Sequence, residues 1–137
     1  MKTLLITLLV SLGFTSQGIN SVQAQNQDKG MHASWNVLLQ KYVDDAGNVD
    51  YSSWKKNQTD LDKYIQLLEK KPPADYWDKN DSLTYFINAY NAVTIKLILD
   101  NYPLKSIRDI KDPWDSKSLN LPNNTMPLND IELQSLI

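Results

Sequence analysis

The segment that most constrains the fold is the apolar stretch from about residue 80 to Asn101. In a helix, its apolar side chains would cover nearly all sides. A surface helix would instead show one apolar stripe opposite a charged face. The sequence therefore predicts a central core helix that starts at about Asn80 or Asp81 and ends at Asn101, with the rest of the chain packed around it.

A narrow polar stripe interrupts this helix. Thr84, Asn88 and Asn91 occupy positions i, i+4 and i+7, which share one side of a helix. A buried carboxamide needs hydrogen-bond partners, because unsatisfied polar groups are costly in a core. Either the asparagines hold the backbone of a neighbouring segment, or the stripe is the polar wall of a binding pocket. An amide is no general base or nucleophile, so any catalytic part would be limited to orienting a group or stabilising an oxyanion.

Two helices are expected before the central one. The first spans about residues 31–43, where apolar residues follow the spacing of one helix face. Residues 44–48 have the composition of a turn. The second helix starts at Asp50 as its N-cap and ends at Pro72-Pro73.

Shorter elements are expected after Pro103. The sequence predicts a short helix over 104–110, a loop over 111–115, strands over 118–121 and 125–128, and a helix with Asn129 as N-cap and Glu132 in a variant capping box. Trp114 is either a lid on the core or a platform on which a ligand stacks. The predicted class is α+β, predominantly helical, with three main helices and a small β-hairpin near the C-terminus.

The amino terminus predicts export. Lys2 precedes a Leu-rich apolar run that ends at Phe14, and Val22-Gln23-Ala24 has the pattern that signal peptidase reads. The run is shorter than the roughly 18–20 residues that span a bilayer, so we expect a cleaved signal and no stable membrane anchor. The predicted organisation is a signal peptide over 1–24, a flexible arm over 25–34 and a folded domain over 35–137, in a secreted or periplasmic protein.

Composition restricts the chemistry. The sequence has no Cys and one His, His32, so it offers no disulfide, no Cys–His pair and no metal site of familiar spacing. No metal or cofactor is expected. The formal net charge is −2 and no Lys/Arg stripe is present, which disfavours nucleic acid. The classes of partner that remain are a small ligand and a protein.

Several motifs occur in an order typical of one family. They are Tyr42-Val43, Gly47 to Tyr51, Phe86 to Ala92, Tyr102 to Ile107, Pro113-Trp114 and Pro127 to Glu132. In this order they resemble DUF547, a family of uncharacterised proteins, over the first half of that family from about Trp35. Members usually continue with a His where Leu133 stands, and later with a Cys-containing stretch.

The resemblance leaves two functions open. One is a non-catalytic binding module. The other is a truncated part of a hydrolase or acyl-transfer enzyme whose catalytic residues lie in the missing C-terminal half. Because the resemblance stops halfway, we expect an incomplete domain in which the chain beyond about Asp112 packs loosely.

Overall fold

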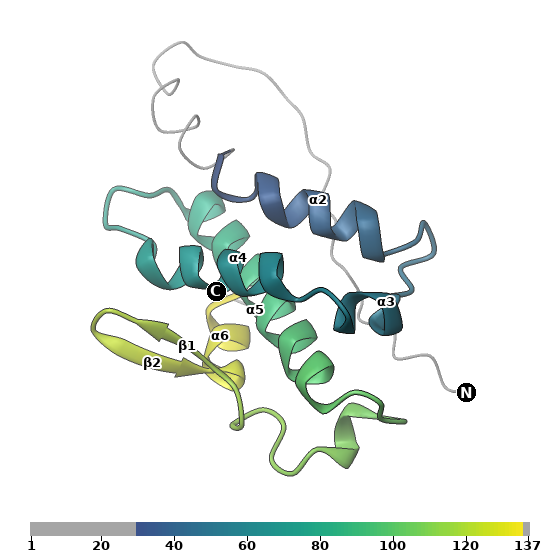
Figure 1. Ribbon diagram of the computed structural model, residues 1–137. Helices are drawn as coiled ribbons and strands as arrows, with labels where there is room; N and C mark the ends of the chain where they lie inside the picture. The colour runs from purple at the N-terminus through teal and green to yellow at the C-terminus, as the bar shows by residue number, and fades with distance from the viewer. Residues whose placement is uncertain (1–29, 136–137) are drawn as a thin grey trace.

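The computed structural model describes residues 30–135, which form a helical fold with one small hairpin (Figure 1). The elements in chain order are α2 (Ala33–Tyr42), α3 (Tyr51–Lys55), α4 (Thr59–Lys70), α5 (Lys79–Asn101), the 3-10 helix η1 (Ile107–Asp109), β1 (Ser118–Leu121), β2 (Asn124–Pro127) and α6 (Leu128–Ser135). The predicted fold class is confirmed. The predicted signal peptide and residues 25–29 of the predicted arm lie outside the described residues, and residues 33–34 belong to α2.

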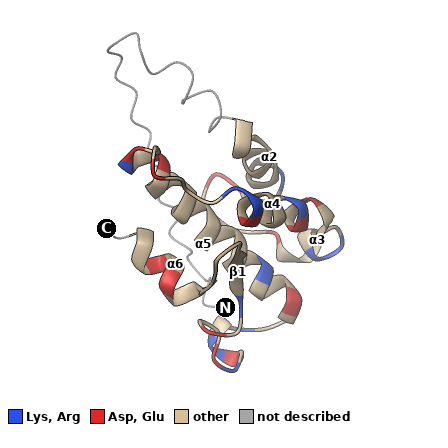
Figure 2. Ribbon diagram, turned by 90° about the vertical axis from the view of Figure 1, so that its left-hand side faces the viewer, with Lys and Arg blue, Asp and Glu red and all other residues tan. Residues whose placement is uncertain are grey.

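The long helix α5 is the centre of the molecule, as predicted. It contacts α3, α4, α6 and β1, and Figure 2 shows it between α4 and α6. It begins slightly earlier than expected, because the carboxylate of Asp78 caps it by accepting a hydrogen bond from the main-chain N–H of Asp81 over 2.8 Å. Within the described residues, no helix is long and apolar enough to cross a membrane.

The first helix and the turn after it are confirmed. Trp35 of α2 stacks on Tyr64 of α4 with ring centroids 5.2 Å apart, which joins the outer helices. In the turn, Asp44 accepts a hydrogen bond from the main-chain N–H of Asn48 over 2.8 Å. Gly47 has φ +82°, a conformation that glycine adopts without strain.

The second predicted helix is divided into α3 and α4, so the expectation of one continuous helix was wrong. Its predicted N-cap is confirmed, since Asp50 accepts from the main-chain N–H of Ser53 over 3.0 Å. At the break, the side-chain amide of Gln58 donates to the carbonyl oxygen of Lys55 over 3.3 Å. This bond occupies a carbonyl that a continuous helix would have used, so the interruption leaves it satisfied.

The chain beyond Asp112 packs firmly, which corrects the expectation of loose packing. Leu119, Leu128 and Ile131 are fully buried, because α6 and β1 use a side of α5 that the amino-terminal helices leave open. The strands pair antiparallel, with Ser118 opposite Pro127.

The predicted capping role of Asn129 was also wrong. Because α6 begins at Leu128, Asn129 lies inside its first turn. Its side-chain amide donates to Asp115 over 3.4 Å, which connects the helix to the loop before β1.

Candidate functional site

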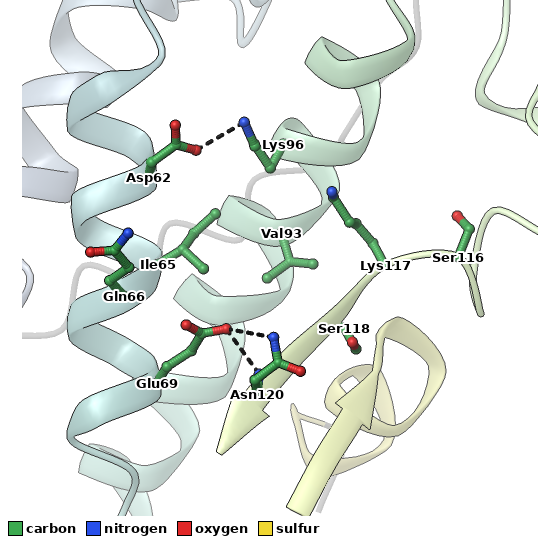
Figure 3. Close-up of a pocket in the computed structure, with 10 residues that line it drawn as sticks. All are labelled: Asp62, Ile65, Gln66, Glu69, Val93, Lys96, Ser116, Lys117, Ser118 and Asn120. Atoms are coloured by element: carbon green, nitrogen blue, oxygen red, sulfur yellow. Dashed lines mark hydrogen bonds and ion pairs between the residues drawn. The ribbon is translucent and has the colours of Figure 1, made fainter. Parts of the chain in front are cut away.

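A pocket of about 440 Å³ lies between α4, α5 and the start of β1 (Figure 3). This volume falls within the range of small-molecule sites. Ten residues line the pocket: Asp62, Ile65, Gln66, Glu69, Val93, Lys96, Ser116, Lys117, Ser118 and Asn120. Eight of them are polar or charged, so the arrangement suits a polar ligand.

Helix α4 supplies one wall of the pocket. Asp62, Ile65, Gln66 and Glu69 are spaced i, i+3, i+4 and i+7, and therefore share one helix face. The step of seven residues from Asp62 to Glu69 corresponds to about 10 Å along the helix axis. The two carboxylates thus stand at opposite ends of the wall.

An ion-pair network made of Asp62, Lys96, Asp100 and Lys117 fixes one end of the pocket. The ammonium group of Lys96 lies 2.9 Å from Asp62 Oδ1 and 3.0 Å from Asp100 Oδ1. The ammonium group of Lys117 lies 2.7 Å from Asp100 Oδ2. The network connects α4, α5 and Lys117, the residue just before β1, so it sets the spacing of the pocket walls.

The network keeps Lys96 and Asp100 charged at neutral pH. Burial acts to lower the pKa of Lys96, but hydrogen bonds with Asp62 and Asp100 outweigh it and raise that pKa above its ordinary value. Burial acts to raise the pKa of Asp100, but hydrogen bonds from Lys117 and Lys96 outweigh it and lower that pKa. Both shifts move the pKa further from pH 7, whereas a general acid or base works best with a pKa near the working pH.

Glu69 and Asn120 join the walls at the other end. Glu69 Oε1 accepts hydrogen bonds from the main-chain N–H of Asn120 over 3.0 Å and from its side-chain amide over 3.2 Å. Both bonds use the same oxygen atom. Among residues 30–135, no basic side chain lies within ion-pair distance of Glu69.

The charge of Glu69 also affects a buried residue, Tyr85. Burial, and then the negative charge of Glu69, raise the pKa of Tyr85 on α5. The Tyr85 hydroxyl donates to the carbonyl oxygen of Leu68 over 2.8 Å. Glu69 therefore adds negative charge to its end of the pocket, where no basic side chain of residues 30–135 forms an ion pair with it.

The structure places the sequence-predicted site residues elsewhere. Along α5, Thr84 is exposed, Asn88 is half-buried and Asn91 is 7% exposed. At 100° per residue, this stripe faces away from Val93 and Lys96, which line the pocket. Trp114 is 37% exposed in the loop before β1 and does not line the pocket.

The pocket residues could not be predicted from the sequence for two reasons. Asp62 lies on the polar face of an amphipathic helix, where acids are normally only solvated. Its ion-pair partner Lys96 is distant in the sequence. One signal was present, since Lys96 is the single charged residue between Asp81 and Asp100 in an otherwise apolar and polar-neutral helix. A charge at that position requires a partner.

Possible metal ligands and similarity to known proteins complete the description of the site. In the described part of the chain, His, Cys, Asp and Glu form no group of three or more that could hold a metal ion. Residues 74–137 match the family model of DUF547, a protein of unknown function. The match covers slightly less than half of the chain and is consistent with a partial DUF547 domain. No curated protein and no solved structure matches this chain.

The DUF547 segment covers part of the molecule. It contains α5, the hairpin and α6, and within it the motif from Phe86 to Ala92 forms the middle of the central helix. The motif pieces from Tyr42 to Tyr51 precede the DUF547 match, and so does α4. The pocket therefore has one wall inside the DUF547 segment and one wall before it.

Proposed function

We propose that this protein is an exported, non-catalytic binding module whose small polar ligand occupies the pocket between α4, α5 and β1. The observation that carries this proposal is the ion-pair network. Its charged groups, on α4, on α5 and in the segment just before β1, hold one another in place with ion-pair distances of 2.7–3.0 Å. Polar groups fixed in this way orient a ligand without having to be ordered by it.

The state of the ionisable groups favours binding over catalysis. Lys96 and Asp100 have pKa values displaced away from neutrality by their partners, so neither is poised to exchange a proton. The hydroxyls of Ser116 and Ser118 would need an adjacent base to act as nucleophiles. The single His of the sequence, His32, instead contacts the Tyr64 hydroxyl through Nδ1 over 2.6 Å.

Export is the second part of the proposal. It is supported by Lys2, the apolar run that follows it and the small residue at Ala24. The ligand would then be met outside the cytoplasm, in the periplasm or the medium.

The binding proposal can be tested by NMR. Amide chemical shifts of the full chain are recorded during titration with a set of amino acids, sugars and dicarboxylates. We expect shifts clustered at Ile65, Val93 and Ser118, which contribute to all three sides of the pocket. Gln66→Trp, at the exposed rim, should block the response by filling the opening.

A matched variant separates blocking from general disturbance. Lys70→Trp puts the same bulk at an exposed position of α4 that does not line the pocket, and should leave the response intact. Shifts that cluster at Asn88 and Asn91 would place the site on the polar stripe instead and overturn the proposal, as would a set of ligands without any effect at the pocket.

A further inference from the structure

We infer that the ligand is a small hydroxylated amine whose ammonium group pairs with Glu69. The inference rests on the proposed binding function and adds the chemical class of the ligand. It starts from the distribution of charge in the pocket. The ion-pair network contains two acids and two lysines, so it is neutral as a whole. Glu69 is the acid left over, and the pocket with its network therefore carries one net negative charge.

The Glu69 carboxylate is held ready for a cation. Asn120 donates twice to Oε1, which fixes the orientation of the group, and Oε2 takes part in neither bond. A carboxylate has room for about four hydrogen bonds across its two oxygens. An ammonium group at Oε2 would add a charge-assisted bond without displacing Asn120.

The remaining lining indicates hydroxyl groups on the ligand. Gln66 and Ser118 offer neutral donors and acceptors, and Ile65 and Val93 offer an apolar surface. Ser116 offers an acceptor only, because its hydroxyl donates to the carbonyl oxygen of Pro113 over 3.1 Å. A sugar ring has hydroxyls at its edge and C–H groups on its faces, so it matches both parts of this lining. An anionic ligand would instead approach Glu69 and lysines that are already paired, which is unfavourable.

The test compares three sugars that share one pyranose ring and differ in the group at carbon 2. Glucosamine, protonated at its amine, is titrated calorimetrically into the full chain beside glucose and N-acetylglucosamine, which are neutral. We expect glucosamine to bind about tenfold more tightly than the other two, the effect of one hydrogen bond to a charged group. Glu69→Gln should remove that advantage, because it keeps the side-chain size and an oxygen for Asn120 but loses the charge.

Glu132→Gln is the matched control, since it makes the same substitution at an exposed position of α6 that does not line the pocket. It should leave all three affinities unchanged. Equal affinities for the three sugars, or a glucosamine preference that survives Glu69→Gln, would overturn the amine assignment while leaving a sugar-binding pocket. If none of the three binds but another compound shifts the pocket amides, the ligand class is wrong and the binding function stands. If no compound shifts the pocket amides, both the ligand class and the binding function are wrong.

Discussion

The ammonium group of Lys55 in α3 lies 2.6 Å from the main-chain carbonyl oxygen of Leu99, in the last turn of α5. This oxygen also accepts a hydrogen bond from the main-chain N–H of Tyr102 over 3.3 Å. Carbonyls at a helix end carry partial negative charge, so a cation there stabilises the end of α5. We expect Lys55→Met, which keeps the length of the side chain but removes its charge, to lower the free energy of unfolding by about 1–3 kcal/mol. Urea denaturation measures this difference.

Lys56→Met is the control, because Lys56 is the exposed neighbour and caps α3 through its main chain, which the substitution keeps. It should change stability by less than about 0.5 kcal/mol. Equal effects of the two variants would mean that the contact with Leu99 contributes nothing.

A second prediction concerns the bond between α4 and α5. Tyr85 is fully buried and its hydroxyl donates to the carbonyl oxygen of Leu68. Tyr85→Phe should destabilise the fold by about 1 kcal/mol, the typical net value of one hydrogen bond, since the main-chain N–H of Lys71 still reaches the same carbonyl. Tyr76→Phe provides the comparison at a residue that is 77% exposed. A thermal melt of Tyr85→Phe that coincides with that of Tyr76→Phe would contradict the prediction.

The polar stripe of α5 gives a third prediction. Asn91 is buried and Asn88 is half-buried, so a charge introduced at Asn91 is harder to hydrate. Asn91→Asp should therefore lower the free energy of unfolding by about 3–5 kcal/mol at neutral pH, as expected for an uncompensated buried charge. Asn88→Asp should lower the free energy of unfolding clearly less. Denaturant titrations measure both values, and the opposite order of the two variants would contradict this explanation of the stripe.

The fourth prediction is a pH dependence. Hydrogen bonds from Lys117 and Lys96 outweigh burial and hold the pKa of Asp100 below its ordinary value of 3.8. A carboxyl whose pKa is lowered in the folded state adds stability above its unfolded pKa and loses that contribution as the pH falls through its folded pKa. Asp100→Asn should therefore be less stable than the unaltered protein at pH 7, and the difference should shrink as the pH falls below about 4.

The control is Asp75→Asn, in the exposed loop between α4 and α5. Its stability should follow that of the unaltered protein throughout the titration. A difference for Asp100→Asn that stays constant down to the lowest pH would show that the ion pair is not its cause.

The fifth prediction is that the exported protein begins at Gln25. The Lys2 region and the Val22-Gln23-Ala24 pattern motivate it. N-terminal sequencing of protein recovered from the envelope or the medium measures it. Recovery of a chain that still begins at Met1 would count against cleavage.

Local patterns explain why most elements could be predicted. The central helix, the Asp50 cap and the hairpin each depend on residues close together in the sequence. The break between α3 and α4 was missed because no Gly or Pro marks it, and the Gln58 side chain closes it only once the chain has turned.

The candidate site could not be predicted in the same way. Its contacts join residues far apart in the chain, such as Glu69 with Asn120, and no local pattern encodes such a pair. The stripe of Thr84, Asn88 and Asn91 was visible because it repeats along one helix, and the structure places it away from the pocket. Periodicity identified a helix face correctly, but it carries no information on which face meets another segment.

The position of α4 before the DUF547 segment has a consequence for relatives of this protein. The wall that carries Asp62 and Glu69 precedes residue 74, whereas Lys96, Lys117 and Asn120 follow it. Substitutions in α4 alone can therefore reverse or remove the charge that faces the pocket without touching the segment by which the family is recognised. Proteins that share this segment can diverge in what they bind, and a ligand found for one of them should be transferred to another only after the residues of its α4 have been compared.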